Sequence, residues 1–387
     1  MSSAWFCAWA YSQPTIRPGA FRISEYLPLV KGKNVAVVCN YASKVNSTHL
    51  VDTLLFYSRQ EGTAFSVKRV FSPEHGFSGT YDAGSKVDGA LMLYDSVPVV
   101  SLYGSKTKPS KSDLQDIEIV LFDLQDVGVR FYTYISTLHY VMQACAEEGI
   151  KLVVLDRPNP HIQYVDGPVL EMKFNSFVGM HPVPIVYGMT IGEYANMING
   201  EGWLGENMKC TLKVIEIGNY WRHSRYSFPE KPSPNLPDMR SVMLYPSLCL
   251  FEGTVISVGR GTPSPFQVFG HPDYPEKNYS FIPKSKPGAS LNPEYKNLRC
   301  FGVDLTRTSI DSLYQTHQLN LSYLLAAYLK MNSKELFFNE YFNLLAGTDQ
   351  LQKQILAGFT EKEIRASWEP GLKNFETIRQ KYLIYPE

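Results

Sequence analysis

The chain has 387 residues, 44% of them hydrophobic and 19% charged, which is enough for about two domains with a sizeable core. Its 37 Lys and Arg residues balance its 37 Asp and Glu residues, so the charge gives no reason to expect a nucleic acid or an anionic membrane surface as a partner. No run of about 18 apolar residues occurs, and no transmembrane segment is predicted.

The cysteines and the aromatic residues narrow the class of protein further. The six cysteines lie far apart, without a C-x-x-C motif or a Cys/His spacing typical of zinc, so we expect no metal site. Aromatic residues make up 13% of the chain, with 25 Tyr. Tyr-rich surfaces suit carbohydrates, because sugar C–H faces pack on the rings while hydroxyl groups bond to the polar tips, although Tyr is also an ordinary core residue.

Residues 1–22 are predicted to form an N-terminal arm. Within it, Ala8-Trp9-Ala10 has the form of a signal-peptidase site, but the basic n-region is missing and the apolar run is short. We interpret this stretch as a truncated secretion signal, which predicts an exported, for instance periplasmic, protein. The alternative is a disordered or packed arm with no targeting role.

From Ile23 onward the pattern alternates between strands and helices. Apolar runs at 35–39, 65–71, 117–122 and 151–155 are typical of strands that are covered on both faces, and helices are expected after the first and third of them. Residues 23–244 are therefore predicted to form a Rossmann-like, doubly wound, mainly parallel α/β sheet, the catalytic domain.

Two longer stretches are predicted to shape a pocket. Residues 76–116 exceed a normal connection, and residues 218–292 are dense in Pro, Gly and aromatic residues. A strand at 300–305 and several helices follow. Residues 245–387 are therefore predicted to be a second, smaller α+β domain that closes a cleft over the first.

Polar residues follow each predicted strand at the point where it ends. They are Asn40, Glu74, Asp123 with Asp126, and Asp156 with Arg157. Right-handed crossovers place the carboxyl ends of parallel strands along one edge of the sheet, where ligands bind in such folds. The sequence therefore predicts the functional site at this edge.

Glu74 is the leading catalytic candidate. It follows a buried strand together with His75, and glycines at Gly76 and Gly79 indicate a tight turn. A glutamate in a cleft with apolar walls can serve as a general acid, so we predict that Glu74 is the proton donor of a glycoside hydrolase. The alternative is a structural carboxylate at a turn, and His75 could orient Glu74, bond a sugar hydroxyl or lie in the core.

Glycosidases usually need a second carboxylate, and Asp123 and Asp126 are the candidates. The alternatives are that Asp126 caps the following helix, or that Asp123 pairs with Arg130. Gln125 and Arg130, in the same segment, are possible substrate-binding residues, but their pattern leaves a structural role open.

Further substrate-binding candidates come from three places in the chain. Tyr132 and Tyr134 could line a sugar subsite or pack at a helix start, and Asn40 ends the first strand. Arg260 lies between two glycines, which let the backbone approach an anion that Arg can bind bidentately. Asn235, among prolines, could bond hydroxyl or N-acetyl groups, or form an Asx turn.

Motifs that are missing exclude other chemistry. No G-x-G-x-x-G follows the first strand, no phosphate-binding G-x-x-x-x-G-K-[ST] occurs, and no G-x-S-x-G is present. A dinucleotide, ATP and a serine hydrolase of the α/β type are therefore not indicated.

Five segments of this chain also resemble, in the same order, the NamZ-type exo-β-N-acetylmuramidases, a family long described only as a domain of unknown function. They are Ser72-Pro-Glu-His-Gly76; Phe122-Asp-Leu-Gln-Asp-Val-Gly128 with Arg130-Phe-Tyr-Thr-Tyr134; Asp156-Arg-Pro-Asn-Pro160; Pro232-Ser-Pro-Asn235; and Glu252-Gly-Thr254 with Gly259-Arg-Gly-Thr262. One such motif is weak evidence, but five in order over about residues 25–385 are specific.

The resemblance implies an enzyme that releases N-acetylmuramic acid (MurNAc) from the non-reducing end of peptidoglycan fragments such as MurNAc-GlcNAc, in cell-wall turnover. It implies a Rossmann-like domain and a smaller C-terminal domain with the site between them, Glu74 as the catalytic glutamate, no metal or organic cofactor, and export. MurNAc carries a lactyl carboxylate, so Arg260 or Arg130 is expected to bind it. A non-catalytic muropeptide-binding protein and another MurNAc hydrolase or lyase remain the alternatives.

Overall fold

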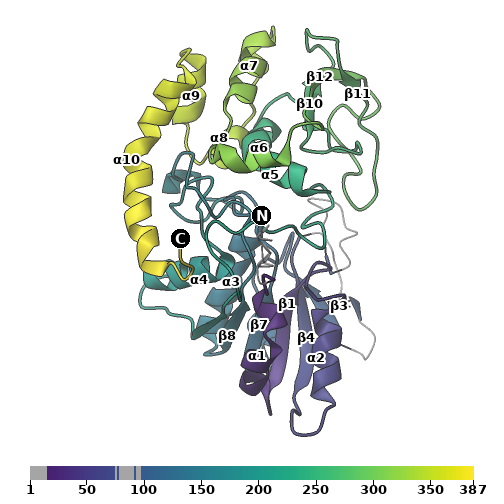
Figure 1. Cartoon of the computed structure of the whole chain (residues 1–387), viewed down its shortest axis with the longest axis vertical. Helices are drawn as coiled ribbons and strands as arrows, with labels where there is room; N and C mark the ends of the chain where they lie inside the picture. Colours follow the sequence, from purple (N-terminus) through teal and green to yellow (C-terminus); the bar gives the residue numbers. More distant parts are fainter. Residues whose placement is uncertain (1–14, 75, 78–90, 93–96) are drawn as a thin grey trace, which may run out of the picture.

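The computed structural model describes residues 15–74, 76–77, 91–92 and 97–387. A large sheet occupies one lobe, and a second lobe of helices with a small sheet lies at the other end of the long axis (Figure 1). The segment from 1 to 14, on which the prediction of a secretion signal rests, is outside the described residues.

The large sheet has seven strands in the order β5-β6-β4-β1-β7-β8-β9. Six of them are parallel: β1 (Asn34–Cys39), β4 (Ser66–Ser72), β6 (Pro98–Ser101), β7 (Ile119–Asp123), β8 (Lys151–Leu155) and β9 (Leu212–Ile215). The short β5 (Leu91–Met92) pairs antiparallel with β6 at the edge. Taken in chain order, the parallel strands run outward from β1 and then return to its other side, which is the Rossmann arrangement. The predicted fold class is confirmed.

Alternation along the central strands explains why the sheet is covered on both faces. In β1, Val35 and Val37 belong to one buried cluster, whereas Ala36 and Val38 belong to the other. Helices α1 (Ile23–Val30) and α2 (Leu50–Ser58) bury their apolar sides in the first cluster. Helices α3 (Tyr134–Glu147) and α4 (Ile191–Gly200) do so in the second. A two-stranded ribbon, β2 (Lys44–Val45) with β3 (Thr48–His49), precedes α2.

The expected domain boundary at 244/245 falls inside helix α5 (Met239–Leu248) and stays a prediction. The second lobe contains an antiparallel sheet of β10 (Val268–His271), β12 (Cys300–Asp304) and β11 (Ser280–Phe281), in that order. Its helices are α6 (Ile310–Thr316), α7 (Ser322–Lys330), α8 (Tyr341–Ala346), α9 (Gln350–Leu356) and α10 (Glu361–Arg379). This is the smaller α+β unit that the sequence predicts.

The C-terminal segment returns to the first lobe. Helix α10 runs along the side of the molecule from the second lobe toward α4 (Figure 1). Beyond it, the Tyr385 hydroxyl donates to Asp156 Oδ2 over 2.6 Å, and the Ile384 amide donates to Glu193 Oε1 over 2.7 Å. The two lobes are therefore tied together by the end of the described chain as well as by α5.

The described part of the N-terminal arm is packed on the sheet. Arg17 pairs with Gly218, and the Gly19 amide donates to the Asp156 carbonyl over 2.7 Å. A Cβ on Gly19 would collide with the backbone of Ile215, so this approach requires glycine. In the described part of the chain, no helix combines the length and apolar character needed to cross a bilayer.

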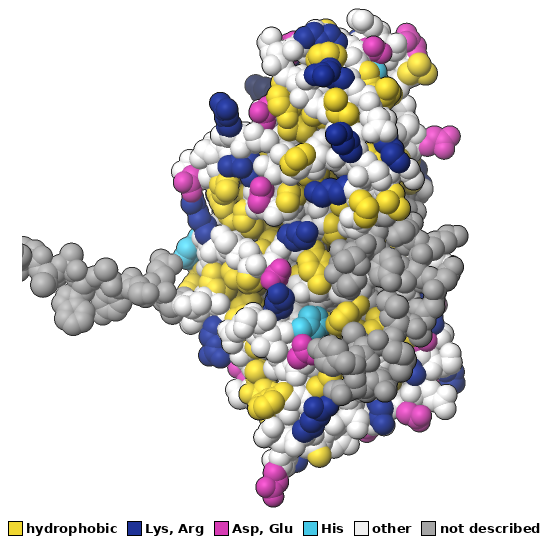
Figure 2. Space-filling view, turned by 90° about the vertical axis from the view of Figure 1, so that its right-hand side faces the viewer, with side chains coloured by type: hydrophobic (Ala, Val, Ile, Leu, Met, Phe, Trp, Pro, Cys, Tyr) yellow, Lys and Arg dark blue, Asp and Glu magenta, His cyan; other side chains and the backbone are white. Residues whose placement is uncertain are grey.

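The surface carries mixed charge. On the face in Figure 2, single Lys and Arg side chains are scattered among hydrophobic and uncharged ones, with Asp and Glu side chains between them. This distribution agrees with the balanced composition.

Candidate active site

Two adjoining pockets lie at the carboxyl edge of the large sheet, where it meets the second lobe. The first has an empty volume of about 420 Å³, and its aromatic lining gives it the name aromatic pocket: Phe131, Tyr132, Tyr134, Tyr245 and Phe266, with Glu74, Thr133, Ser233, Asn235, Leu236 and Arg260. The second, of about 1000 Å³, is the acidic pocket, lined by Glu74, Glu252 and Glu294 with Tyr103, Tyr341, Arg260, Ile256, Ser257, Val258, Ser290, Asn292 and Pro293. Both linings include Glu74 and Arg260, so the pockets adjoin, and the two together are called the cleft.

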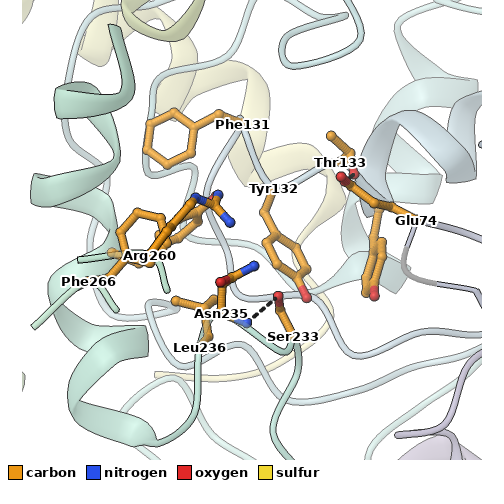
Figure 3. A pocket seen from close by; sticks show the side chains of 11 residues that line it. Glu74, Phe131, Tyr132, Thr133, Ser233, Asn235, Leu236, Arg260 and Phe266 are labelled. Carbon is orange, nitrogen blue, oxygen red and sulfur yellow. Dashed lines mark hydrogen bonds between the residues drawn. The ribbon is translucent and has the colours of Figure 1, made fainter. Parts of the chain in front are cut away.

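Glu74 lies where the two pockets meet. Strand β4 ends at Ser72, since Pro73 cannot donate to the ladder, and Gly76 turns the chain with a φ of 72°. The Thr133 hydroxyl, just before α3, donates a hydrogen bond of 3.0 Å to Glu74 Oε2. Figure 3 shows this pair on one side of the aromatic pocket. The half-buried carboxyl group is thereby held facing the cleft.

Tyr132 and Tyr134 form the wall next to Glu74. Their rings meet edge to face with centroids 4.7 Å apart. The Tyr132 hydroxyl donates to the Pro232 carbonyl over 2.8 Å, and the Tyr134 hydroxyl accepts a bond of 2.7 Å from Asn40 Nδ2. Burial raises the pKa of both phenols well above the usual range, so both stay protonated. Asn40 itself lines neither pocket, and it contacts the wall residue Tyr134 from behind.

Arg260 lies on the opposite side of the aromatic pocket from Glu74 (Figure 3). It stands between Gly259 and Gly261, whose φ angles of 74° and 79° a residue with a side chain rarely adopts. The Arg260 Nε atom bonds to Glu252 Oε1, and the guanidinium lies 5.0 Å from the centre of the Phe266 ring. These contacts fix the direction of the cation toward the cleft.

Asn235 supplies an acceptor between these two sides. Its backbone amide donates to Ser233 Oγ over 3.2 Å, and its Nδ2 donates to the Ala289 carbonyl over 2.9 Å. Its buried Oδ1 has no hydrogen-bond partner among the described residues. A buried acceptor of this kind is costly unless a ligand or water satisfies it, so its position in the pocket wall suits a substrate N–H or hydroxyl group.

Asp123 is not brought into the cleft. Its two oxygens accept hydrogen bonds of 2.6 and 2.8 Å from Arg157 Nε and Nη2, and both side chains are buried. The alternative pairing with Arg130 does not form either, because Arg157 follows the neighbouring strand β8 and lies closer. Asp123 is fully buried and lines neither pocket, so it is not placed to meet a substrate.

Asp126 and Gln125 lie beneath the cleft rather than in its lining. Asp126 Oδ2 accepts bonds from the Tyr187 hydroxyl and from the Gly128 amide, the latter over 2.7 Å, so it shapes the turn and does not cap α3. Burial raises its pKa to about 6 in spite of these bonds. Gln125 Nε2 donates to the carbonyls of Asp126 and Pro158, each over 2.8 Å.

Arg130 is turned away from the cleft. Its Nη1 donates to the carbonyls of Pro168 and Val183 over 2.9 and 2.7 Å, and its Nη2 donates to those of Leu345 and Ala346 over 3.0 and 2.7 Å. The last two carbonyls end helix α8 of the second lobe. Burial lowers the pKa of this guanidinium to about 9. Arg130 therefore joins the lobes. His75 lies outside the described residues.

Comparisons with known proteins match this chain to a family. The model described as "Exo-beta-N-acetylmuramidase NamZ, N-terminal" matches residues 35–240, and the corresponding C-terminal model matches residues 243–385. This chain belongs to the NamZ exo-β-N-acetylmuramidase family. The family consists of glycoside hydrolases, and the expected resemblance is confirmed.

Individual relatives resemble this chain over nearly its whole length. "Peptidoglycan beta-N-acetylmuramidase NamZ" of Bacillus subtilis (strain 168) is 35% identical over 379 residues, which cover 94% of this chain and 89% of that protein. A crystal structure of a DUF1343 family protein from Bacteroides fragilis NCTC 9343 has a TM-score of 0.87 at 43% identity, covering 97% of this chain and all of that one. A second such protein from the same strain has a TM-score of 0.73 at 27% identity, with coverage of 96% and 100%.

Most of the NamZ-like motifs meet in the cleft. They place Glu74, the segment from Phe131 to Tyr134, Asn235 and Arg260 in its walls. The exception is Asp156-Arg-Pro-Asn-Pro160, which builds the buried network below it: Asp156 bonds Thr190, Gly192 and Tyr385, and Arg157 binds Asp123. Among the described residues, no group of three or more His, Cys, Asp or Glu side chains is arranged to hold a metal ion.

Several wall residues were not predicted as site residues. Thr133 and Glu252 lie inside motifs, so their position in the sequence could have suggested them. Tyr103, Glu294 and Tyr341 have no such signal, because they enter the cleft from a loop after β6, from the segment between β11 and β12, and from the start of α8.

Proposed function

We propose that this protein is an exo-acting β-N-acetylmuramidase that releases MurNAc from the non-reducing end of peptidoglycan fragments such as MurNAc-GlcNAc. The observation that carries the proposal is the position of Glu74, held by Thr133 at the junction of two pockets in a NamZ-family cleft. A carboxyl group at a junction of this kind can reach the oxygen between two sugars, one on each side.

In this mechanism Glu74 donates its proton to the glycosidic oxygen as the bond to the MurNAc anomeric carbon breaks. Glu74 is the one carboxyl group among the described residues that line the aromatic pocket. Asp123 and Asp126 lie outside both linings, so we assign neither of them the role of nucleophile. The 2-acetamido carbonyl oxygen of MurNAc is the better candidate to attack the anomeric carbon, since it arrives with the substrate. Water then opens the oxazoline that forms, giving up one proton to Glu74 and leaving free MurNAc.

Recognition of MurNAc is proposed to come from the wall opposite Glu74. Arg260 can bind the lactyl carboxylate, which a GlcNAc residue lacks. Asn235 Oδ1 can accept from the amide N–H or from a hydroxyl group, and the edge-to-face pair of Tyr132 and Tyr134 offers ring surface to the sugar. These contacts would select MurNAc over GlcNAc at the cleaved position.

We also propose that the protein is exported and acts in cell-wall turnover. The support is the Ala8-Trp9-Ala10 sequence and the peptidoglycan substrate named for the Bacillus subtilis relative. Fractionation of cells that express the full-length gene tests this. Recovery in the cytoplasmic fraction, with an unprocessed N-terminus, would contradict it.

The function is tested by hydrolysis of MurNAc-GlcNAc and of aryl β-glycosides of MurNAc and GlcNAc. Loss of a general acid lowers kcat by about 10²- to 10⁴-fold, and we expect this for Glu74→Gln with an unchanged fold. Glu206→Gln, in an exposed loop, is the matched control. Binding of MurNAc without turnover would favour the binding-protein alternative, and a product cleaved at the lactyl ether would favour a lyase.

A further inference from the structure

The side-chain oxygen of Asn235 is a polar group of the aromatic pocket for which the proposed function leaves two partners open, an amide N–H and a hydroxyl group. Asn235 is 2% exposed, and its Oδ1 has no hydrogen-bond partner among the described residues. Such an acceptor is costly to bury unless a ligand or a water molecule satisfies it. Its direction and its neighbours therefore indicate which group of the substrate it meets.

The side-chain amide of Asn235 has a defined orientation. Its Nδ2 donates to the Ala289 carbonyl over 2.9 Å. A carbonyl group can accept but not donate, so turning the amide over would set two acceptors against each other. The Ala289 carbonyl therefore keeps the NH₂ group on its own side and leaves Oδ1 for the pocket. The substrate group that meets Asn235 must be a donor, which excludes the lactyl carboxylate.

The second lobe holds the Ala289 carbonyl in place. Ala289 lies between β11 and β12, in a turn that is closed by two backbone bonds. The Lys286 amide donates to the Ser290 carbonyl over 2.8 Å, and the Ser290 amide donates to the Lys286 carbonyl over 2.9 Å. The direction of the Asn235 side chain thus depends on a rigid segment and not on the pocket alone.

The place of Asn235 in the pocket selects one donor of MurNAc. Figure 3 shows Asn235 between Arg260 and Glu74. In the proposed function, Glu74 meets the glycosidic oxygen on C1 of the sugar, and Arg260 meets the lactyl group on C3. The ring carbon between these two is C2, which carries the acetamido group. The hydroxyl groups on C4 and C6 lie on the far side of C3, away from Glu74.

We propose that Asn235 Oδ1 accepts the N–H of the MurNAc acetamido group and so holds the acetamido carbonyl oxygen in position to attack C1. This inference rests on the proposed function and deepens it, because it names the residue that assists the internal nucleophile. Asn235 is then a catalytic residue as well as a residue that binds the sugar.

The contact strengthens as the reaction proceeds. The acetamido oxygen forms a bond to C1, the bond from C1 to the leaving oxygen breaks, and the Glu74 proton moves to that oxygen. The acetamido nitrogen keeps its own proton, so the oxazoline ring forms as a cation and its N–H becomes a stronger donor. An acceptor that bonds the transition state more tightly than the substrate raises kcat and changes KM little.

The first test compares an aryl MurNAc glycoside with its 2-acetoxy analogue, in which an ester replaces the amide. The analogue keeps the carbonyl oxygen but lacks the N–H. Asn235→Ala is expected to lower kcat about tenfold to a hundredfold for the acetamido compound, with KM changed less than about twofold. For the acetoxy compound the loss should stay below about threefold. A merely structural role of Asn235 would lower the turnover of both compounds equally.

The second test decides between the acetamido N–H and a hydroxyl group. The 4-deoxy and 6-deoxy forms of the same aryl MurNAc glycoside each lack one hydroxyl donor and keep the acetamido group. If Asn235 accepted from one of these hydroxyl groups, Asn235→Ala would have no effect on the compound that lacks it. We expect the loss in kcat to remain about tenfold to a hundredfold for both compounds.

Asn199→Ala is the matched control. Asn199 Nδ2 also donates to a backbone carbonyl, that of Cys210 over 2.8 Å, but Asn199 lies outside the linings of both pockets. This variant should keep the kcat of the unaltered protein. Urea denaturation of both variants shows how much stability each lost bond removes, separately from turnover.

The outcomes separate this inference from the proposed function. An unaltered protein that hydrolyses no MurNAc glycoside would overturn both. An active protein in which Asn235→Ala affects the acetamido and acetoxy compounds equally, or loses its effect on a deoxy compound, would overturn the inference alone. A loss in kcat that is retained with both deoxy compounds and disappears with the acetoxy compound supports it.

Discussion

Arg260, which lines both halves of the cleft, is paired with Glu252 of the acidic pocket. Among the described residues that line the cleft, Arg260 is the one cation, so an incoming carboxylate must share it with Glu252. This pair holds the guanidinium in place before substrate arrives, which lowers the entropy that binding has to overcome.

Arg260→Ala should therefore reduce selectivity for the MurNAc aryl glycoside over the GlcNAc one by about tenfold to a hundredfold, since a charge-assisted hydrogen bond to the lactyl group is lost. The ratio of kcat/KM for the two compounds measures this. Arg260→Lys should keep part of the selectivity, because the charge remains while the bidentate geometry does not. Full selectivity in Arg260→Ala would remove this residue from carboxylate recognition.

The bond from Thr133 to Glu74 predicts a smaller effect on turnover. Thr133→Val keeps the shape of the side chain but removes the donor, and kcat on MurNAc-GlcNAc should fall about tenfold as Glu74 loses its orientation. KM should change little. Thr137→Val, one turn later in α3 and also buried, is the matched control. Equal effects of the two substitutions would show that the helix, and not the bond to Glu74, is responsible.

Asp123 is expected to matter for stability rather than for chemistry. Removing one partner from a buried ion pair leaves an uncompensated charge, so Asp123→Ala should lower the free energy of unfolding by about 3–5 kcal/mol. Urea denaturation measures this. A folded Asp123→Ala protein of normal stability but without activity would instead return Asp123 to the list of catalytic candidates.

The raised pKa of Asp126 predicts that the free energy of unfolding depends on pH. The folded protein holds a proton on Asp126 up to a pH of about 6, whereas the unfolded chain releases it near 4. This group therefore stabilises the fold most below about pH 4, and its contribution is lost as the pH rises through about 6.

Asp126→Asn removes this titration while keeping an oxygen for Tyr187 and Gly128. The free energy of unfolding of the variant minus that of the unaltered protein should therefore be about 2–3 kcal/mol larger at pH 8 than at pH 4. Unfolding free energies from urea titrations at the two pH values test this. A constant difference between the proteins would show that Asp126 titrates normally.

The sheet could be predicted from the sequence because its central strands coincide with short, continuous apolar runs. The run at 35–39 corresponds to β1 (Asn34–Cys39), and the expected strand end before Glu74 is where β4 stops. Glu74 is placed by the end of its own strand and by the turn that follows. Such features depend on neighbours in the sequence, which a pattern can reveal.

The rest of the cleft depends on contacts between distant segments. Asp123 ends β7 and Glu74 follows β4, so both lie at the carboxyl edge of the sheet. Only Asp123 meets Arg157, which follows β8 and pairs with it in the core. Arg130 precedes two pocket tyrosines, but its side chain leaves the cleft for carbonyls more than 200 residues away. Tyr341 and Glu294 depend on how the second lobe packs, which no local motif reports.

The contact between Arg130 and the end of α8 has a consequence for how the cleft works. The five residues from Arg130 to Tyr134 contain the arginine that bonds to the carboxyl end of α8 and the aromatic wall beside Glu74. Tyr341 is the first residue of the same helix. Gly347 has a φ of 75°, and a Cβ there would collide with the Arg130 guanidinium, so the two segments pack closely at this point. The segment that carries the aromatic wall beside Glu74 is thus the same segment that fastens α8, so a change that loosens Arg130 is expected to displace both walls of the cleft together.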